Sequence, residues 1–305
     1  MQSLFTTLPI FLIIAAGYIL TRLSVAQNRW VSPLNNFVYY IALPALTILS
    51  LIGLDLTSTT VQATMLLSIL VSIVCSIIFA VIARLLPFKQ KTQQTIFLTA
   101  TLGNTIFLGI PLAGALTPSI SPAIATTLSI VFFTSTLVSA LFILEIWMKN
   151  SKSGSHLLHS LRTNPIIISL IIGLILAVIP IPKVVQDFVE TPLQLIAQTA
   201  SPLALFALGG FLAHHTLQKR DLPTIAIATI LKLVVLPILF ITALNIYPTT
   251  KDFSQLTILM AATPTAVTAF VLTEKYKLDS RLAAGTILIS TTLSLASILL
   301  ILGLA

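Results

Sequence analysis

The feature that most constrains this chain is a long stretch without a charged side chain. No Asp, Glu, Lys or Arg occurs between Lys91 and Glu145. Soluble domains carry about 25% charged residues, so such a stretch is unusual for a soluble fold. The hydrocarbon core of a bilayer is about 30 Å thick and takes roughly 20 helical residues to cross. The stretch therefore predicts two membrane-spanning helices, with a turn at residues 117–122.

The rest of the chain repeats this pattern. Of the 305 residues, 57% are hydrophobic and 8% are charged. Apolar runs separated by loop signals predict an all-α membrane protein with ten transmembrane helices. The predicted spans are residues 4–23, 34–52, 61–86, 92–116, 123–149, 164–179, 193–213, 222–247, 253–273 and 282–305.

The basic residues divide unevenly between the two sets of loops. One set holds Arg22, Arg29, Arg84, Lys89, Lys91, Lys149, Lys152, Arg162, Lys219, Arg220, Lys275, Lys277 and Arg281. The other set holds only Lys183 and Lys251. Cytoplasmic loops carry the excess of Lys and Arg, so we expect a multi-pass protein of the cell membrane with both termini outside the cytoplasm. The basic residues form no patch with interleaved aromatic residues, and we expect no nucleic-acid partner.

The two halves of the chain resemble each other. Pro9 and Gly17 in the first predicted span match Pro165 and Gly173 in the sixth. The predicted units are residues 1–163, a five-helix repeat with a short loop, and residues 164–305, the second repeat. An odd number of spans reverses direction, so the repeats must be inverted. Inverted repeats are typical of secondary transporters, whose substrate sites lie near the membrane midplane at interrupted helices.

The fourth and ninth predicted spans carry the expected interruptions. A proline inside a helix removes a hydrogen bond and clashes with the preceding turn, which exposes backbone groups at Pro111 and Pro264. The N-terminus of a half-helix is partially positive and favours a carboxylate. The candidate substrate-binding residues are Asn104, Thr105, Gly109, Ile110, Pro111, Thr263, Pro264, Thr265, Thr268 and Lys232. The alternative is that these prolines only kink their helices.

Lys232 is the one charge deep inside a predicted span. It lies ten residues beyond Leu222, roughly 15 Å along the helix at 1.5 Å per residue. No span offers an equally deep acid as a partner. The side chain either ties down carbonyls freed by a broken helix or gives positive potential to an anion site. Glu145 lies four residues before Lys149, and we expect the two to form a simple pair at the membrane surface.

Several motifs resemble the auxin efflux carrier family, which includes the PIN-FORMED carriers and bacterial malonate-type carriers. They are Asn104-Thr105 with Gly109-Ile110-Pro111-Leu112, Pro264 with Phe270-Val271 and Tyr276, and Asn36-Phe37-Val38 with Ala42-Leu43-Pro44. The resemblance covers essentially the whole chain.

The resemblance implies a homodimer that works by elevator-type alternating access. Spans 1, 2, 6 and 7 would form a scaffold, and spans 3–5 and 8–10 would form a transport domain in which broken helices four and nine cross at the two prolines. It also implies that Asn104 contacts the carboxylate of a small organic anion. The central loop, residues 150–163, is short compared with that of the long plant carriers.

Other functional classes fit the sequence less well. We expect no enzyme, because the chain has no nucleophile–base motif and no H-E-x-x-H metal motif. We also expect no cofactor and no metal, and membrane lipid as a surrounding partner. The main alternative is a sodium-coupled organic anion symporter of the bile-acid symporter type, which shares a similar plan. Spans four and nine offer no acid for a sodium site.

Overall fold

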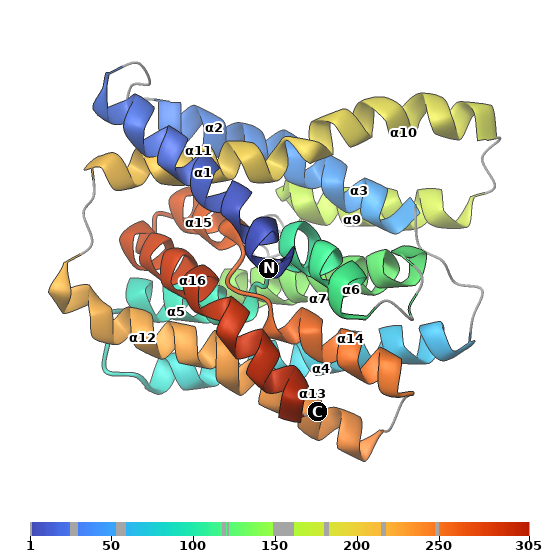
Figure 1. Ribbon diagram of the computed structural model, residues 1–305. Helices are drawn as coiled ribbons and strands as arrows, with labels where there is room; N and C mark the ends of the chain where they lie inside the picture. Colours follow the sequence, from blue (N-terminus) through green and yellow to red (C-terminus); the bar gives the residue numbers. More distant parts are fainter. Residues whose placement is uncertain are drawn as a thin grey trace.

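The computed structural model describes residues 2–24, 30–52, 59–117, 120, 122–148, 162–179, 183–214, 218–247 and 250–304. Figure 1 shows a bundle of helices, and the described residues include no β-strand, only an isolated bridge. In chain order the helices are α1 (Gln2–Arg22), α2 (Val31–Phe37), η2 (Val38–Ala42), α3 (Leu43–Ile52), α4 (Thr59–Leu85), α5 (Gln90–Thr101), η3 (Thr105–Gly109), α6 (Ile110–Leu116), α7 (Pro122–Met148), α9 (Pro165–Val178), α10 (Lys183–Gln198), α11 (Ala200–His214), η4 (Lys219–Asp221), α12 (Leu222–Ile230), η5 (Leu231–Val235), α13 (Leu236–Ile246), α14 (Lys251–Ala262), α15 (Val267–Lys275) and α16 (Ser280–Leu304).

The helices have the length and composition of membrane spans. Within the described ranges, four helical segments are long and apolar enough to cross a bilayer: Gln62–Leu85, Ile124–Met148, Phe188–His214 and Lys219–Ile246. Shorter apolar helices cover Pro9–Arg22, Thr105–Gly114 and Pro165–Ala177. The predicted class of all-α membrane protein is confirmed.

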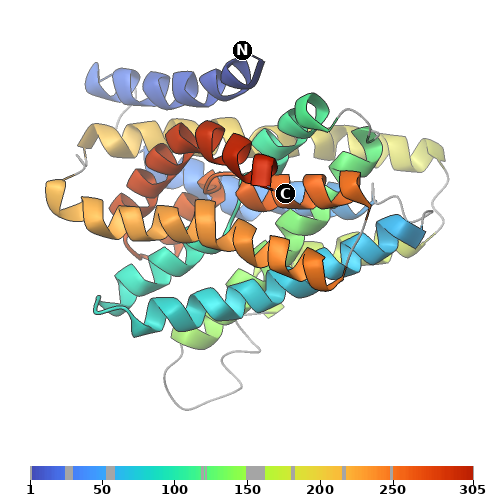
Figure 2. The same ribbon diagram turned by 60° about the horizontal axis from the view of Figure 1, so that its bottom comes forward.

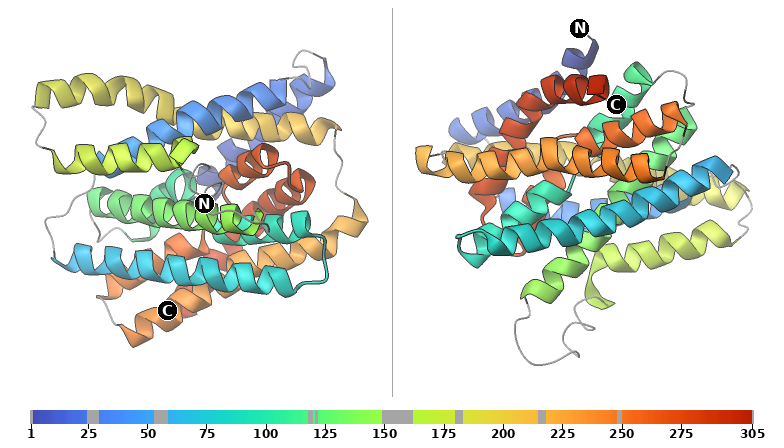
Figure 3. Two further views of the ribbon diagram at one scale, coloured as in Figure 1. Left: turned by 180° about the vertical axis from the view of Figure 1, so that it is seen from behind. Right: turned by 90° about the horizontal axis from the view of Figure 1, so that it is seen from below.

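Helix α4 shows the inside-out polarity of a membrane protein. Leu66, Leu70 and Ile77 on its outer face are more than half exposed, whereas Ser72 and Ser76 on its inner face are buried. The Ser76 hydroxyl bonds that of Ser139 on α7 at 2.7 Å. Apolar residues outward and hydroxyls inward fit an environment in which lipid is the solvent. Figure 3 shows α4 (light blue) beside α7 (green), which it contacts.

Glycines allow two pairs of helices to pack with their backbones in contact. A Cβ atom on Gly17 of α1 would lie 2.2 Å from the Phe206 carbonyl oxygen on α11, and one on Gly209 would lie 2.1 Å from that of Ile14. A Cβ atom on Gly173 of α9 would lie 2.7 Å from a methyl carbon of Leu51 on α3. Small residues at such contacts are typical of membrane helices. Figure 2 shows α1 at the edge of the molecule, running along α11.

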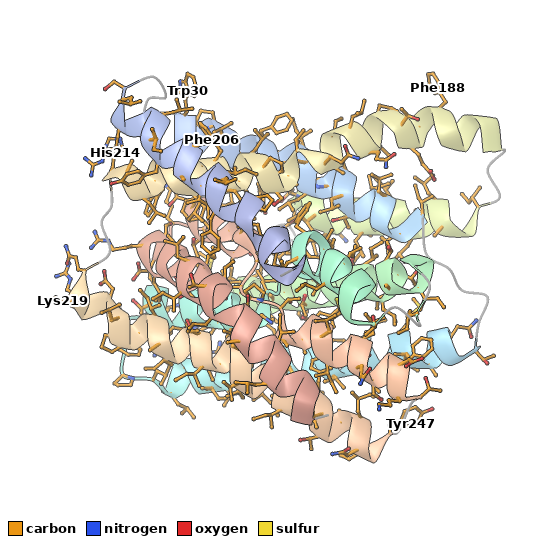
Figure 4. All side chains as sticks on the ribbon, in the orientation of Figure 1. Trp30, Phe188, Phe206, His214, Lys219 and Tyr247 are labelled. Carbon is orange, nitrogen blue, oxygen red and sulfur yellow. The ribbon has the colours of Figure 1, made fainter. Side chains whose placement is uncertain are left out.

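Several basic residues gather at one end of the bundle. Trp30, His214 and Lys219 lie at one end in Figure 4, and Phe188 and Tyr247 lie at the other. Lys89, Arg220, Asp221 and Asp279 line one cavity at the first end. Arg281 also lies there, 3.9 Å from the Asp221 carboxylate. We call this the basic end.

The prediction that Glu145 lies at the surface, paired with Lys149, is wrong. Lys149 lies outside the described residues, and Glu145 is buried rather than exposed. Its carboxylate accepts a hydrogen bond of 2.8 Å from the Tyr276 hydroxyl. Burial, together with the nearby Tyr39, raises the pKa of the Tyr276 phenol far above its usual range. The phenol therefore stays protonated and acts as the donor.

Candidate functional site

Two extended segments cross near the middle of the bundle. Residues 102–104 separate α5 from η3, and residues 263–266 separate α14 from α15. The segments run antiparallel and form a bridge between Gly103 and Thr265. The backbone amide of Asn104 donates to the Pro264 carbonyl at 2.8 Å, and the backbone amide of Ala266 donates to the Leu102 carbonyl at 2.9 Å. We call these two segments the crossing.

Gly103 makes this close approach possible. A Cβ atom there would lie 2.8 Å from the Thr263 hydroxyl and 3.1 Å from the Lys232 ammonium nitrogen. A larger residue would force the Thr263 and Lys232 side chains to move, because atoms at such distances overlap. The sequence pattern pointed to the prolines and did not single out Gly103.

The prolines act differently in the two halves. Pro264 lies in the extended segment itself, as predicted. Pro111 does not lie at the crossing, because the fourth span is interrupted at residues 102–104 and helix α6 begins at Ile110, with Pro111 in its first turn. The preceding turn, η3, is π-helical, and the Gly109 amide bonds the Asn104 carbonyl five residues back at 3.1 Å. The prediction that both prolines mark the crossing is therefore wrong for Pro111, where a wide turn precedes the proline without interrupting the helix.

Most of the predicted threonines bond to the protein. Thr105 donates to the Ser129 carbonyl at 3.2 Å, and Thr265 donates to that of Thr99 at 2.9 Å. Thr263 donates to the Met260 carbonyl at 2.7 Å, which satisfies one acceptor where α14 ends. These hydroxyls hold the crossing together, and their protons are already used.

Asn104 and Thr268 are the predicted polar side chains left without a hydrogen bond among the described residues. Asn104 is 7% exposed and precedes the first residue of η3, but its side chain does not cap that helix. Thr268 is buried in the first turn of α15, where no side chain caps the helix either. The first amides of a helix have no partner within it, and this end is partially positive. The helical run of η3 and α6 and the helix α15 both start at the crossing, so both can present donors there.

Lys232 lies directly beside the crossing. It belongs to the π-helical turn η5, and its side chain is fully buried. Its ammonium donates to the Ala261 carbonyl at 2.8 Å. That carbonyl lacks its usual helical partner because the Thr265 amide bonds the Ser290 hydroxyl instead, at 3.2 Å. This hydrogen bond matches the first of the two predicted roles, in which Lys232 ties down a carbonyl freed by a broken helix.

Three supporting residues were not predicted from the sequence. Ser290 on α16 accepts from the Thr265 amide, and Ser129 on α7 accepts from Thr105 through its carbonyl. The Ser129 hydroxyl also contacts the sulfur of Met260 at 3.2 Å. A Cβ atom on Gly109 would lie 2.8 Å from the same sulfur, so Gly109 fits closely against α14. A serine within an apolar span is the sequence signal for such supporting residues, but the sequence contains too many of these serines to single out Ser129 and Ser290.

Known proteins resemble this chain over nearly its whole length. A "Putative malonate transporter" from Rhizobium meliloti (strain 1021) is 28% identical over 304 residues, which cover 95% of this chain and 92% of the relative. An uncharacterized transporter from Methanocaldococcus jannaschii is 27% identical over 301 residues, 96% of each chain. Residues 3–302 match the family described as membrane transport protein. The chain therefore belongs to this family of membrane transporters, the auxin efflux carrier-like family that its motifs resemble.

Proposed function

We propose that this protein is a secondary transporter that carries small organic anions, in particular carboxylates, across the cell membrane. The observation that carries the proposal is the side-chain amide of Asn104, which makes no hydrogen bond to the described residues and lies at a crossing where two helices begin. A carboxylate there would accept from the amide and from first-turn backbone N–H groups. Lys232 adds a positive charge behind the crossing, although its hydrogen bond goes to the protein.

The name of the Rhizobium meliloti relative narrows the substrate to small dicarboxylates. That name includes malonate, and its similarity extends along nearly the whole chain. Two carboxylates suit a site with two helix N-termini, because each terminus offers donors to one anion group. Ile106 and Phe107 are half-buried beside Asn104 and could contact the apolar part of the substrate.

We further propose that the chain has ten spans in two inverted five-helix repeats, residues 1–163 and 164–305. Helix packing supports this. The first span contacts the seventh through α1 and α11, and the sixth contacts the second through α9 and α3. The third contacts the fifth through α4 and α7, and the eighth contacts the tenth through α12 and α16. Each pairing is the one that a two-fold repeat requires.

The same contacts suggest how the protein moves. We assign α1–α3 and α9–α11 to a scaffold, and the remaining helices, with the crossing, to a transport domain that moves as one body. An apolar cavity of about 660 Å³ lies between the two sets, lined by Leu51 and Leu174 on one side and Ile73 and Val138 on the other. An apolar, loosely filled boundary has few bonds to break during an elevator-type movement. A homodimer held by the scaffold, with both termini outside the cytoplasm, completes the proposal.

Transport by the purified full-length chain in proteoliposomes tests the proposal. Radiolabelled malonate should accumulate, and unlabelled small carboxylates should compete. Replacing Asn104 with Ala should raise KM about ten- to a hundredfold, because a hydrogen bond to a charged group is worth about 1.5–3 kcal/mol. Asn245→Ala is the matched control, since Asn245 is exposed on α13.

The same transport assay also distinguishes the alternative functions. Dependence on sodium would favour a sodium-coupled symporter, and dependence on a pH gradient would show proton coupling. If the wild type moves amines or sugars in preference to carboxylates, the anion assignment is wrong. If Asn104→Ala transports as the wild type does, Asn104 is not part of the site.

A further inference from the structure

Asn35 on α2 is a buried polar side chain with no hydrogen-bond partner in the part of the chain that the structure describes. It is 4% exposed, and neither its amide nitrogen nor its amide oxygen makes a hydrogen bond. Buried amides are nearly always paired, so an unpaired one requires an explanation. Its neighbour Asn36 is exposed and needs none. A ligand that the protein binds and releases would explain why the side-chain amide of Asn35 is buried without a partner.

Asn35 lines a polar cavity between α2 and the end of α15. The cavity measures about 200 Å³ and is lined also by Ser32, Asn36, Val271, Glu274, Lys275 and Lys277. Val271 lies four residues beyond Val267, where α15 leaves the crossing, which is about 6 Å along the helix. The cavity therefore lies about one helical turn from the crossing, toward the basic end.

The charges of the lining favour an anion. Lys275 and Lys277 outnumber the single acid, Glu274. Lys275 also lines a neighbouring cavity that Tyr40 lines, and its ammonium donates to the Tyr40 hydroxyl. Lys277 has a φ of 53°, a conformation that glycine adopts more easily. Lys277 therefore places a positive charge at this helix end, in a backbone conformation where glycine would be less strained.

We propose that this cavity is a second carboxylate-binding subsite, where the substrate binds on its way between the basic end and the crossing. The subsite rests on the proposed function, since it serves the same anion. The Asn35 amide group and the lysines would donate to the carboxylate. Liquid water takes about 30 Å³ per molecule, so the cavity has the volume of about six or seven waters. This is room for a small carboxylate.

Transport measured from each side separately tests the subsite. Membrane vesicles of opposite orientation, with the basic end outside or inside, are supplied with radiolabelled malonate. Asn35→Ala and Lys275→Gln should raise KM about tenfold when malonate arrives from the basic end. From the other end KM should stay within twofold, because the substrate then reaches Asn104 without passing the cavity. Lys89→Gln removes an exposed charge at the same end and is the control for Lys275.

An aspartate at position 35 distinguishes an anion from a cation. Asn35→Asp adds a negative charge with little change in shape, so it should raise KM more than Asn35→Ala does. The oxygens of Ser32, Asn36 and Glu274 could instead hold sodium, and Asn35→Asp would then transport as well as the wild type or better in sodium. That result would overturn the proposal. Asn245→Asp is the matched control for adding a charge.

The two proposals fail in different ways. If Asn104→Ala impairs transport from both sides but the Asn35 and Lys275 variants keep wild-type KM values on both, only the subsite is wrong. Equal increases of KM from both sides would also reject it, since they indicate a general structural effect. If the wild-type vesicles transport no small carboxylate, the proposed function itself is wrong.

Discussion

At the scale of single residues, the crossing depends on side chains that replace missing backbone partners. Where α14 ends, Thr263 donates to the Met260 carbonyl and Lys232 donates to that of Ala261. In lipid an unpaired carbonyl has no water to bond, so each replacement matters more than it would at a soluble surface. A lysine can do this from a neighbouring helix because its side chain is long and carries three donors.

Two variants test whether Lys232 serves as a structural tie to the Ala261 carbonyl or supplies positive charge for substrate binding. Lys232→Met leaves the Ala261 carbonyl unpaired and should destabilise the protein by about 1–3 kcal/mol. Lys232→Gln keeps a donor without the charge and should recover part of that loss. Thermal unfolding of the purified variants measures this.

Malonate affinity of the same two variants separates the roles. A Gln variant of normal stability but weaker affinity would assign the charge to substrate binding. A Met variant as stable as the wild type would contradict the structural tie.

At the scale of elements, the crossing joins two interrupted helices through backbone hydrogen bonds. The bonds between Leu102–Asn104 and Pro264–Ala266 need the segments to approach closely, which Gly103 permits. Ser290 and Thr99 then attach Thr265 to α16 and α5. The interruption is therefore a junction fixed by backbone and side-chain hydrogen bonds, which suits the proposed role of the crossing as a binding site.

Glycine substitutions test this junction. Gly103→Ala should destabilise the protein by about 1–3 kcal/mol and remove most malonate uptake, because its methyl group overlaps the Thr263 hydroxyl. Gly114→Ala on α6 is the control, since a Cβ atom there meets nothing within 4 Å. The control should be neutral or up to about 1 kcal/mol more stable, as alanine favours helix. Equal uptake by both variants would argue against a close crossing.

At the scale of the whole molecule, the basic end should face the cytoplasm. Lys219 is exposed at the basic end, and Lys251 is exposed at the start of α14, close in sequence to Tyr247 at the other end. Single cysteines at these positions should react with a membrane-impermeant thiol reagent from opposite sides. Lys251→Cys should be labelled in intact cells and Lys219→Cys only after the cells are opened. Labelling of Lys219→Cys from outside would reverse the proposed orientation. Cys75 is buried and should not interfere.

The class of the protein and the position of the interruption near Asn104 and Pro264 follow from the sequence. Uncharged apolar runs require lipid, and the motif around Asn104 was enough to predict the family. These properties are local, because hydropathy and a short motif belong to consecutive residues. The same holds for Asn104 and Pro264, which were expected near the interruption before their contacts were known.

Which groups meet depends on the tertiary structure. The interruption of the predicted fourth span lies at Gly103, where the segment pairs with residue 265, and not at Pro111. The hydroxyls of Thr105, Thr263 and Thr265 proved to be occupied, and Glu145 proved to bond Tyr276, more than a hundred residues away. Such pairings depend on which helices pack side by side. Many apolar faces can pack interchangeably in lipid, so the pattern of one chain does not specify its partners, and geometry alone separates a free donor from a used one.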